Sequence, residues 1–297
     1  MRGRFAPSPT GVFHLGNLRT ALLAWLFARS ERSGFLLRFE DLDAGSVRPE
    51  YYDAQRRDLE RLGLDWDDEL RQVDHLDRYR EAVDRLIDAG ATYRCYCTRR
   101  EIREAAAAPH GDLPGGAYPG TCRNLSVAQE RRHRDNGRSP AVRLRTSGAR
   151  VSFVDRQLGE VSAVLDDMVL TRRDSTPAYN LVVVVDDAFQ RVEEVVRGDD
   201  LATSTPRQLL LAGELGLPAP SFAHVPLVLN AAGDRLAKRD GAVTLDDRNA
   251  LGQSDRQVLG MLAASVALAD PGDAPPIDEL LDRFDAAALP RTPWIFG

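Results

Sequence analysis

Prolines and a histidine near the amino terminus restrict most strongly what this chain can fold into. Pro7 and Pro9 follow the short segment 2–6, and His14 comes shortly before an apolar-periodic stretch. Prolines end a strand, and the apolar spacing after them predicts an amphipathic helix over residues 17–33. The first amide groups of a helix lack intrahelical partners and attract anions. The sequence therefore predicts a strand, a turn and a helix, with a phosphate site at the turn.

The residues at this turn are the candidates for contacting a nucleotide. His14 and Asn17 carry side chains that can donate hydrogen bonds to phosphate oxygens, and Gly16 leaves room for an adenine ring. The alternative for His14 is a purely structural role as a cap of the turn. The prolines and Gly11 placed before it favour the nucleotide site.

Short apolar segments and amphipathic segments alternate along much of the chain. Strands are predicted at 35–40, 181–185 and 224–229, and helices from 49 and at 79–89, 206–215, 258–267 and 277–284. This alternation is typical of an α/β fold with a doubly wound parallel sheet. The run 181–185 is apolar throughout, which predicts a strand buried on both faces.

The alternation stops between residues 95 and 178. Loops rich in glycine and proline and two weak strands, 141–145 and 151–155, replace it there. We therefore expect an insertion that splits the α/β domain, followed by a short helical end. The expected segments are 1–94, 95–178, 179–245 and 246–297.

The composition limits the classes of protein to which the chain can belong. Its longest apolar runs, 22–27 and 181–185, are far shorter than the ~20 residues of a membrane span, and no apolar leader follows Met1. We therefore expect a cytoplasmic protein without membrane contact. The net charge of -6 argues against bulk electrostatic affinity for nucleic acid but does not exclude a local basic face.

The chain has three cysteines, Cys95, Cys97 and Cys122. An odd number in a cytosolic sequence argues against a disulfide framework and favours metal ligation. Three thiolates are one ligand short of a tetrahedral structural zinc site, and from the residues alone His110 is the candidate for the fourth ligand. The alternative of three reduced core cysteines fits poorly with a segment so rich in glycine and proline.

Of the 39 basic residues, only Lys238 is a lysine. A coding preference for arginine explains the scarcity but not the position of the one lysine that remains. Lysine differs from arginine most where a compact point charge must meet a phosphate.

The segment from Arg4 to Asn17 resembles the first signature of class I aminoacyl-tRNA synthetases, in the form seen in the glutamyl and glutaminyl branch. The family core is His-Ile-Gly-His, so the chain differs from it at Asn17. The segment Arg235-Leu-Ala-Lys238-Arg239 loosely matches the second signature, Lys-Met-Ser-Lys-Ser. The resemblance covers residues 4 to about 248 and implies a Rossmann-like catalytic domain. The residues that it assigns to ATP are His14, Gly16, Asn17 and Lys238, and His14, Asn17 and Lys238 are the implied catalytic residues.

The resemblance also implies a glutamate site. It assigns Glu40 to the substrate ammonium group, and Tyr179 and Arg197 to the recognition of glutamate. An arginine fork that binds the side-chain carboxylate bidentately would select glutamate over glutamine. The full implied set is Arg4, Ala6, Ser8, Glu40, Tyr179 and Arg197.

A short glutamylating subfamily shows Cys-x-Cys followed by Tyr-x-x-x-Cys, and Tyr118 to Cys122 reproduces that ending. The resemblance therefore implies one structural zinc ion held by Cys95, Cys97, Tyr118 and Cys122, with His110 as the alternative to Tyr118. The ion would hold the shape of the inserted, acceptor-type subdomain.

The length after the second signature distinguishes members of the family. Full-length glutamyl enzymes continue into an anticodon-binding domain of on the order of 100 residues, whereas about 60 residues follow Lys238. Leu201 also stands where the short members are expected to have leucine.

The resemblance thus implies a monomer that activates L-glutamate with ATP and Mg²⁺ without RNA. It would then pass the glutamyl group to queuosine at the wobble position of tRNA(Asp). The alternatives are a compact glutamyl-tRNA synthetase charging tRNA(Glu), a small nucleotidyltransferase, and a catalytically silent RNA-binding paralogue.

Overall fold

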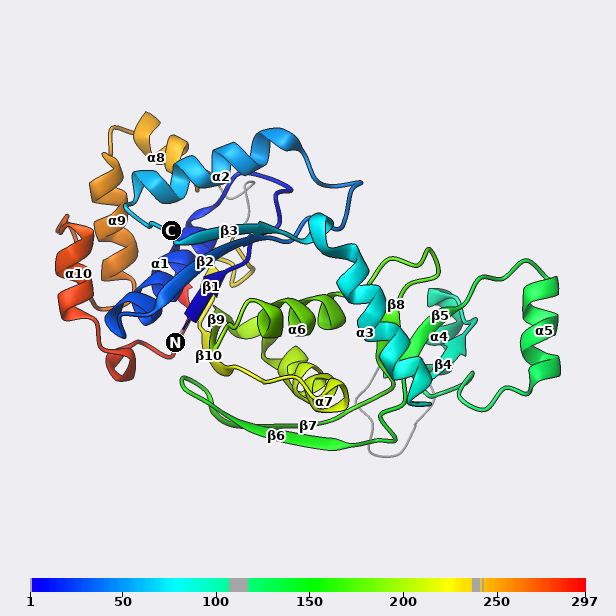
Figure 1. Cartoon of the computed structure of the whole chain (residues 1–297). Coiled ribbons are helices and arrows are strands. Elements are labelled where there is room, and N and C mark those ends of the chain that lie inside the picture. Colours follow the sequence, from blue (N-terminus) through cyan, green and yellow to red (C-terminus); the bar gives the residue numbers. More distant parts are fainter. Residues whose placement is uncertain (1, 107–116, 237–240, 242) are drawn as a thin grey trace.

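The computed structural model describes residues 2–106, 117–236, 241 and 243–297. In these residues, parallel strands lie between layers of helices, and a separate group of antiparallel strands and helices projects from one end (Figure 1). The sequence predicted this α/β architecture. Among the described helices, none is both long and apolar enough to cross a bilayer.

The parallel strands form the centre of the fold. They are β1 (Arg2–Phe5), β2 (Gly34–Phe39), β3 (Asp68–Arg71), β9 (Glu194–Gly198) and β10 (Ser221–Val225). β2 pairs with β1 and β3, and β9 pairs with β10. β9 lies beside β1, where Glu193 N donates to Arg2 O at 2.9 Å. The strand order changes direction between β1 and β9, and ligands of such sheets bind at the carboxyl ends of the strands beside this point.

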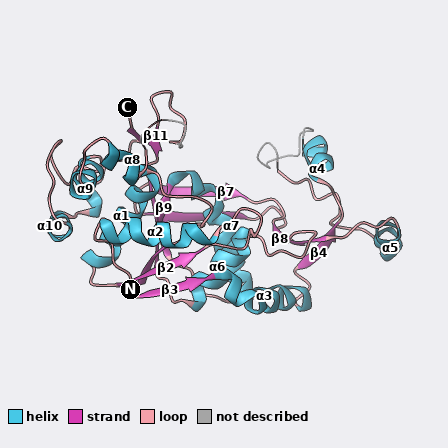
Figure 2. Ribbon diagram, turned by 90° about the horizontal axis from the view of Figure 1, so that it is seen from above, coloured by secondary structure: helices cyan, strands magenta, loops and turns pink. Residues whose placement is uncertain are grey.

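Helices cover both sides of these strands. They are α1 (Leu15–Ser30), α2 (Pro49–Arg61), α3 (Leu76–Asp88), α6 (Tyr179–Phe189), α7 (Thr205–Leu215), α8 (Leu245–Ala250), α9 (Asp255–Ala264) and α10 (Ile277–Arg283). α9 and α10 pack on α1, whereas α6 packs on α3 and α7 (Figures 1 and 2). Short 3₁₀ segments, Gln72–His75, Asp199–Ser204 and Ala286–Ala288, complete the connections.

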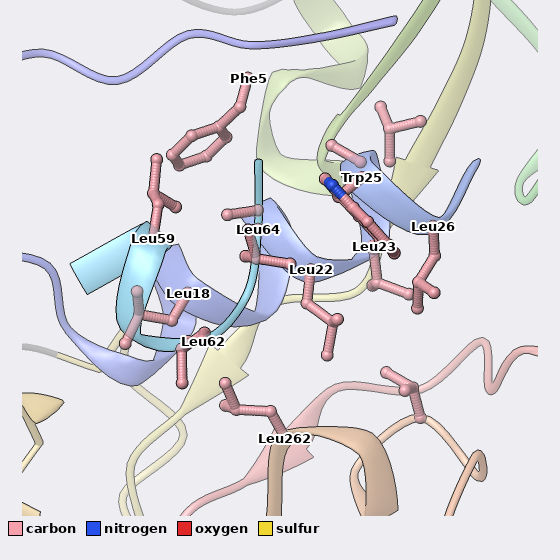
Figure 3. Packing of buried hydrophobic residues seen from close by; sticks show 14 of the residues in the cluster. Phe5, Leu18, Leu22, Leu23, Trp25, Leu26, Leu59, Leu62, Leu64 and Leu262 are labelled. Carbon is pink, nitrogen blue, oxygen red and sulfur yellow. The ribbon is translucent and has the colours of Figure 1, made fainter. Parts of the chain in front are cut away.

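The helix after the first turn is buried on every side. Its leucines contact residues of α2, of the loop after α2 and of α9, including Leu59, Leu62 and Leu262 (Figure 3). Leu18 points to one side of this helix and Leu23 and Phe27 point to the opposite side, and all three are buried. The expectation of an amphipathic helix at 17–33 is therefore corrected to a fully enclosed helix, because the carboxyl-terminal helices cover the face that would otherwise meet water.

The apolar run 181–185 is a helix, not the predicted strand. It lies in α6 and packs between α3 and α7, against Tyr79, Leu86 and Leu211. A short run that is apolar at every position has no period with which to separate a buried strand from a buried helix. Burial among helices overrides the strand preference of four consecutive valines. The strand in this region is β9, which the sequence pattern did not reveal.

The elements between α3 and α6 lie to one side of the parallel strands (Figure 1). β4 (Thr92–Cys95), β5 (Ala141–Leu144) and β8 (Val169–Thr171) pair in antiparallel fashion, and β6 (Arg150–Asp155) and β7 (Gly159–Val164) form a hairpin. α4 (Arg99–Ala106) and α5 (Val127–Asp135) lie at the outer end. The β6–β7 hairpin reaches back to β10, where Arg156 N donates to Phe222 O at 2.9 Å.

The last part of the chain is not purely helical as expected. β12 (Trp294–Ile295) returns to pair in parallel with β11 (Val228–Leu229). The predicted strand 224–229 is divided into β10 and β11, with Pro226 between them. A proline has no N–H to donate to a neighbouring strand, which accounts for the interruption.

An acidic group at the junction of α2 with α8 and α9 makes stability depend on pH. Burial and the nearby Asp246 raise the pKa of Asp58 to about 6. Because the folded state favours the protonated form, the contribution of Asp58 to the free energy of unfolding is greatest below pH 4 and is lost as pH rises through 6. We expect Asp58→Asn to be more stable than the parent chain at pH 8, by on the order of 1 kcal/mol, and to lose this advantage at pH 4.

Urea unfolding at both pH values measures this difference. Asp53→Asn is the matched control, because Asp53 lies on the same helix with 72% of its side chain exposed. An Asp58→Asn effect that is equal at pH 4 and pH 8 would contradict the assignment.

Candidate active site

A cavity of about 670 Å³ opens at the carboxyl ends of β1, β2 and β9. Its lining includes residues from distant segments of the chain that the sequence analysis named. They are Arg4, Ala6, Ser8, His14, Gly16, Asn17, Glu40, Tyr179, Arg197 and Leu201. The position matches the switch point of the strand order, where a bound ligand can face several strand ends at once.

His14 caps the helix that begins beside the cavity. Its Nδ1 accepts from Asn17 N at 3.3 Å, while His14 N donates to Asn17 Oδ1 at 3.2 Å. The two residues thus form a reciprocal capping box. Because Nδ1 accepts, a neutral His14 ring carries its proton on Nε2, the nitrogen that can donate to a phosphate. His14 can therefore cap the helix through Nδ1 and bind a phosphate through Nε2 at the same time.

Gly16 is needed for a reason that the sequence analysis did not give. A Cβ at this position would lie 2.9 Å from Cε1 of His14, which is closer than real Cβ contacts. The glycine therefore allows the His14 ring to fold back over the first turn of α1.

A buried group of charges lies beneath the cavity. Arg38 donates from Nη1 to Asp187 at 2.6 Å and from Nη2 to Glu40 at 3.3 Å. Burial alone would lower the pKa of Arg38, but Asp187, Glu40 and Asp186 raise it above its usual range. Arg4 lies 3.7 Å from Asp187 and donates to Val196 O at 3.2 Å. These contacts fix the carboxylate of Glu40 at the end of β2.

Burial raises the pKa of Glu40, although Arg38 and Arg4 oppose this effect. The carboxylate keeps 15% of its side-chain surface exposed, and this residue lines the cavity. A partly desolvated carboxylate of this kind gains stabilisation from a cation, such as an ammonium group, that enters the cavity.

Arg197 is held by several partners. Its Nε donates to His224 Nε2 at 3.1 Å, and its Nη2 donates to Thr205 Oγ1 at 2.8 Å and to Gln208 Oε1 at 3.0 Å. Nη1 lies 3.4 Å from the hydroxyl of Tyr179. A bidentate fork on a ligand needs two nitrogens, and two are already used within the protein. In this arrangement, Nη1 and the Tyr179 hydroxyl are the groups of the pair that a ligand in the cavity can reach.

Tyr179 is the first residue of α6 and does not precede a strand as predicted. Although 38% of the surface of Tyr179 is exposed, desolvation around its hydroxyl and the carboxylate of Glu40 raise the pKa of this hydroxyl, which therefore remains protonated and able to donate.

Lys238 and Arg239 of the second signature lie outside the described residues, as does His110. The signature begins at the cavity, because Arg235 and Leu236 line it. Arg235 Nη1 donates to Asp200 Oδ2 at 2.7 Å. This ion pair links the start of the second signature to the segment that follows β9.

Gln55 is a cavity residue that the sequence analysis missed. It lies on α2, and its Nε2 donates to Ser8 O at 3.0 Å and to Gly11 O at 2.7 Å. It thereby holds the loop of the first signature. A single glutamine in a helix of charged residues carries no pattern that would have identified it.

The three cysteines and Tyr118 lie together among the elements between α3 and α6. The ligand atoms of Cys95, Cys97 and Cys122 are all within 4.8 Å of one another. The Tyr118 hydroxyl lies 3.3 Å from Cys95 Sγ and 3.8 Å from Cys97 Sγ. Sulfur atoms bound tetrahedrally to zinc at about 2.3 Å are separated by about 3.8 Å, so these donor atoms fit such a site.

The close contacts between the thiols shift their pKa values in opposite directions. Hydrogen bonds from Cys122 and Cys97 lower the pKa of Cys95, whereas hydrogen bonds to Cys122 and Cys95 raise the pKa of Cys97. Three adjacent thiolates repel one another, and a bound cation would remove this repulsion.

Comparison with known proteins agrees with this geometry. The family model described as "tRNA synthetases class I (E and Q), catalytic domain" matches residues 1–264. A glutamyl-Q tRNA(Asp) synthetase of Nocardia farcinica is 58% identical over 294 residues, covering 99% of this chain and 92% of the relative. Another from Symbiobacterium thermophilum is 43% identical, with coverage of 98% and 94%.

The fold also matches solved structures. A glutamate tRNA ligase from Elizabethkingia meningosepticum, crystallised in complex with its amino acid, superposes with a TM-score of 0.85 at 26% identity. The match covers all of this chain and 67% of that ligase. The chain therefore belongs to the class I tRNA synthetases of the E and Q branch, and within this branch to the family of glutamyl-Q tRNA(Asp) synthetases.

Proposed function

We propose that the protein activates L-glutamate with ATP and transfers the glutamyl group to queuosine at the wobble position of tRNA(Asp). The observation that carries the proposal is the cavity, where Glu40, Arg197 and the start of α1 face one space. The relatives named glutamyl-Q tRNA(Asp) synthetase support the choice of acceptor.

In the proposed site, the two ends of glutamate meet opposite charges. Arg197 Nη1 and the Tyr179 hydroxyl bind the side-chain carboxylate, and Glu40 binds the α-ammonium group. Arg4 adds positive charge to the wall between them, close to the α-carboxylate. Ala6 and Ser8 provide small side chains beside the substrate.

The first step needs positioning more than covalent help from the protein. An oxygen of the α-carboxylate attacks the α-phosphorus of ATP in line, and pyrophosphate leaves to give glutamyl-adenylate. ATP enters as its Mg²⁺ complex, and the metal reduces the charge repulsion between the phosphates. His14 Nε2, the amide of Asn17 and the first amides of α1 donate to the phosphates. We assign Lys238 to the same phosphates from the sequence signature.

In the second step, a hydroxyl oxygen of the queuosine ring attacks the carbonyl carbon of the adenylate. The bond to phosphate breaks, AMP leaves with the electron pair, and the hydroxyl proton passes to solvent or to the AMP phosphate. The product is a glutamyl ester on the modified base.

Cys95, Cys97, Tyr118 and Cys122 would hold one zinc ion. The ion would cross-link β4 with the loop before α5 and would take no part in the chemistry, because this cluster is not among the residues that line the cavity. Segments 1–94 and 179–245 would then form the catalytic domain, 95–178 the inserted subdomain and 246–297 the end that packs on α1.

Cys122→Ser should remove zinc while leaving glutamate activation without tRNA largely intact. The variant lacks one of three thiolate ligands, so bound metal should fall from about one ion per chain to nearly none after dialysis against a chelator. Elemental analysis measures the change. Ser126→Ala, which removes the cap of α5, is the control expected to keep the metal. A parent protein without zinc, or a Cys122→Ser variant with full zinc, would contradict the assignment.

The acceptor is tested by incubating the protein with labelled glutamate, ATP and purified tRNA. We expect labelling of tRNA(Asp) that contains queuosine and none of tRNA(Asp) that lacks it. Removal of the label by nuclease digestion of the anticodon loop would place it on the wobble base. Equal labelling of tRNA(Glu) at its 3′ end would favour the compact glutamyl-tRNA synthetase instead.

A further inference from the structure

Asp155 and His224 form a buried pair behind Arg197, away from the cavity wall. His224 Nδ1 lies 2.6 Å from Asp155 Oδ2, and neither side chain has measurable exposure. The pair joins the end of β6 to β10, so it connects the inserted hairpin with the parallel strands. No motif in the sequence indicated it.

The hydrogen bonds around His224 fix its tautomer. Nε2 accepts from Arg197 Nε at 3.1 Å and lies 3.1 Å from Thr205 Oγ1. Thr205 Oγ1 accepts from Arg197 Nη2, so its own proton is available to His224. With Nε2 as an acceptor, the ring must carry its proton on Nδ1, and this proton is donated to Asp155 Oδ2.

The two oxygens of Asp155 share the backbone N–H of His224 but differ in their other partners. Oδ1 accepts from the backbone N–H groups of Gln157, Leu158 and His224, at 2.9, 3.0 and 3.1 Å. Oδ2 lies 2.6 Å from Nδ1 of the imidazole and also accepts from His224 N at 3.2 Å. One oxygen therefore shapes the turn between β6 and β7, and the other determines which nitrogen of His224 is protonated.

We propose that Asp155 and His224 are positioning residues for glutamate recognition, holding Arg197 so that Nη1 faces the side-chain carboxylate. This inference rests on the proposed binding of glutamate in the cavity. Arg197 Nε and Nη2 stay engaged with His224, Thr205 and Gln208, and the guanidinium cannot rotate to present another edge.

Asp155→Asn separates this role from a merely structural one. The Asn oxygen can still accept from the N–H groups of Gln157, Leu158 and His224. Its NH₂ group replaces Oδ2, faces Nδ1 and gives up only the longer contact with His224 N. The ring must then move its proton to Nε2, which opposes the N–H of Arg197. In ATP–pyrophosphate exchange without tRNA, we expect KM for glutamate to rise about tenfold while KM for ATP changes less than about twofold.

The matched control is Gln157→Ala, which removes the hydrogen bond from Gln157 Nε2 to Ala286 O at the same turn. It should lower thermal stability without raising KM for glutamate. An unchanged KM for glutamate in Asp155→Asn, or a parallel rise in both KM values in Asp155→Asn and Gln157→Ala, would overturn the proposal.

A second pair of variants tests the other side of the ring. The amide of His224→Gln reaches the position of Nε2 and can accept from Arg197, whereas that of His224→Asn reaches only the position of Nδ1. We expect KM for glutamate to be lower in His224→Gln than in His224→Asn by about fivefold or more. Equal values for the two variants would contradict the proposal.

¹⁵N NMR of the parent protein measures which ring nitrogen of His224 carries the proton, so this test does not depend on the activity of any variant. The signal of His224 is identified because it is missing from the spectrum of His224→Gln. A neutral His224 with its proton on Nδ1 supports the proposal, and a proton on Nε2 overturns it. A parent protein without glutamate-dependent exchange would contradict the proposed function itself. A parent protein with normal exchange and an Asp155→Asn variant with unchanged KM would contradict only the positioning.

Discussion

Arg197→Gln should lower kcat/KM for glutamate by about two orders of magnitude in ATP–pyrophosphate exchange, which corresponds to about 3 kcal/mol. The guanidinium supplies the positive charge opposite the side-chain carboxylate, and glutamine offers only a neutral amide. The preference of this variant for glutamate over glutamine should also decrease, because the two amino acids differ in charge and not in shape. Parallel assays with both amino acids measure the preference.

Arg207→Gln is the matched control for this variant. Arg207 lies on α7, donates to Asp166 at 2.6 Å and does not line the cavity. Its loss should leave selection between glutamate and glutamine unchanged. An Arg197→Gln variant that folds and still prefers glutamate as strongly as the parent would remove Arg197 from recognition.

Glu40→Gln should lower kcat/KM for glutamate by a similar factor of about a hundred. The change removes the carboxylate proposed to bind the α-ammonium group and leaves Arg38 without one of its anionic partners. Two effects therefore add: a lost attraction to substrate, and positive charge near the place where the ammonium group must bind. Exchange kinetics with glutamate varied at saturating ATP measure the loss.

Glu69→Gln is the matched control, because it also takes a carboxylate partner away from an arginine. Glu69 pairs with Arg56 at 2.6 Å near the surface, where such pairs contribute about 0–1 kcal/mol. Exchange by this variant should match the parent. If Glu40→Gln bound glutamate as tightly as Glu69→Gln, another group would have to bind the ammonium.

The elements with a clear local signal were predicted well. Prolines ended β1, and the apolar spacing after them gave α1 to within two or three residues at each end. The odd number of cysteines led us to expect that Cys95, Cys97 and Cys122 share a metal site, and the structure places their sulfur atoms within 4.8 Å of one another.

The elements without a local signal were not predicted. α6 appeared as a strand because a uniform apolar run has no period, and β9 was missed because its residues mix charge with two valines. Arg197 and Tyr179 were identified only through the family resemblance.

Gln55, Asp155 and His224 could not be found at all from the sequence. Their roles depend on tertiary contacts between residues 27 to 69 positions apart, which no local pattern records.

The bound state gives the most direct test of the central claim, that glutamyl-adenylate forms in the cavity between α1 and Arg197. A crystal structure with a nonhydrolysable glutamyl-adenylate analogue shows where the analogue binds and which residues contact it. We expect the side-chain carboxylate at Arg197 Nη1 and the Tyr179 hydroxyl, the ammonium group beside Glu40, and the phosphate at the start of α1. An analogue bound outside this cavity, or bound with its carboxylate away from Arg197, would contradict the account.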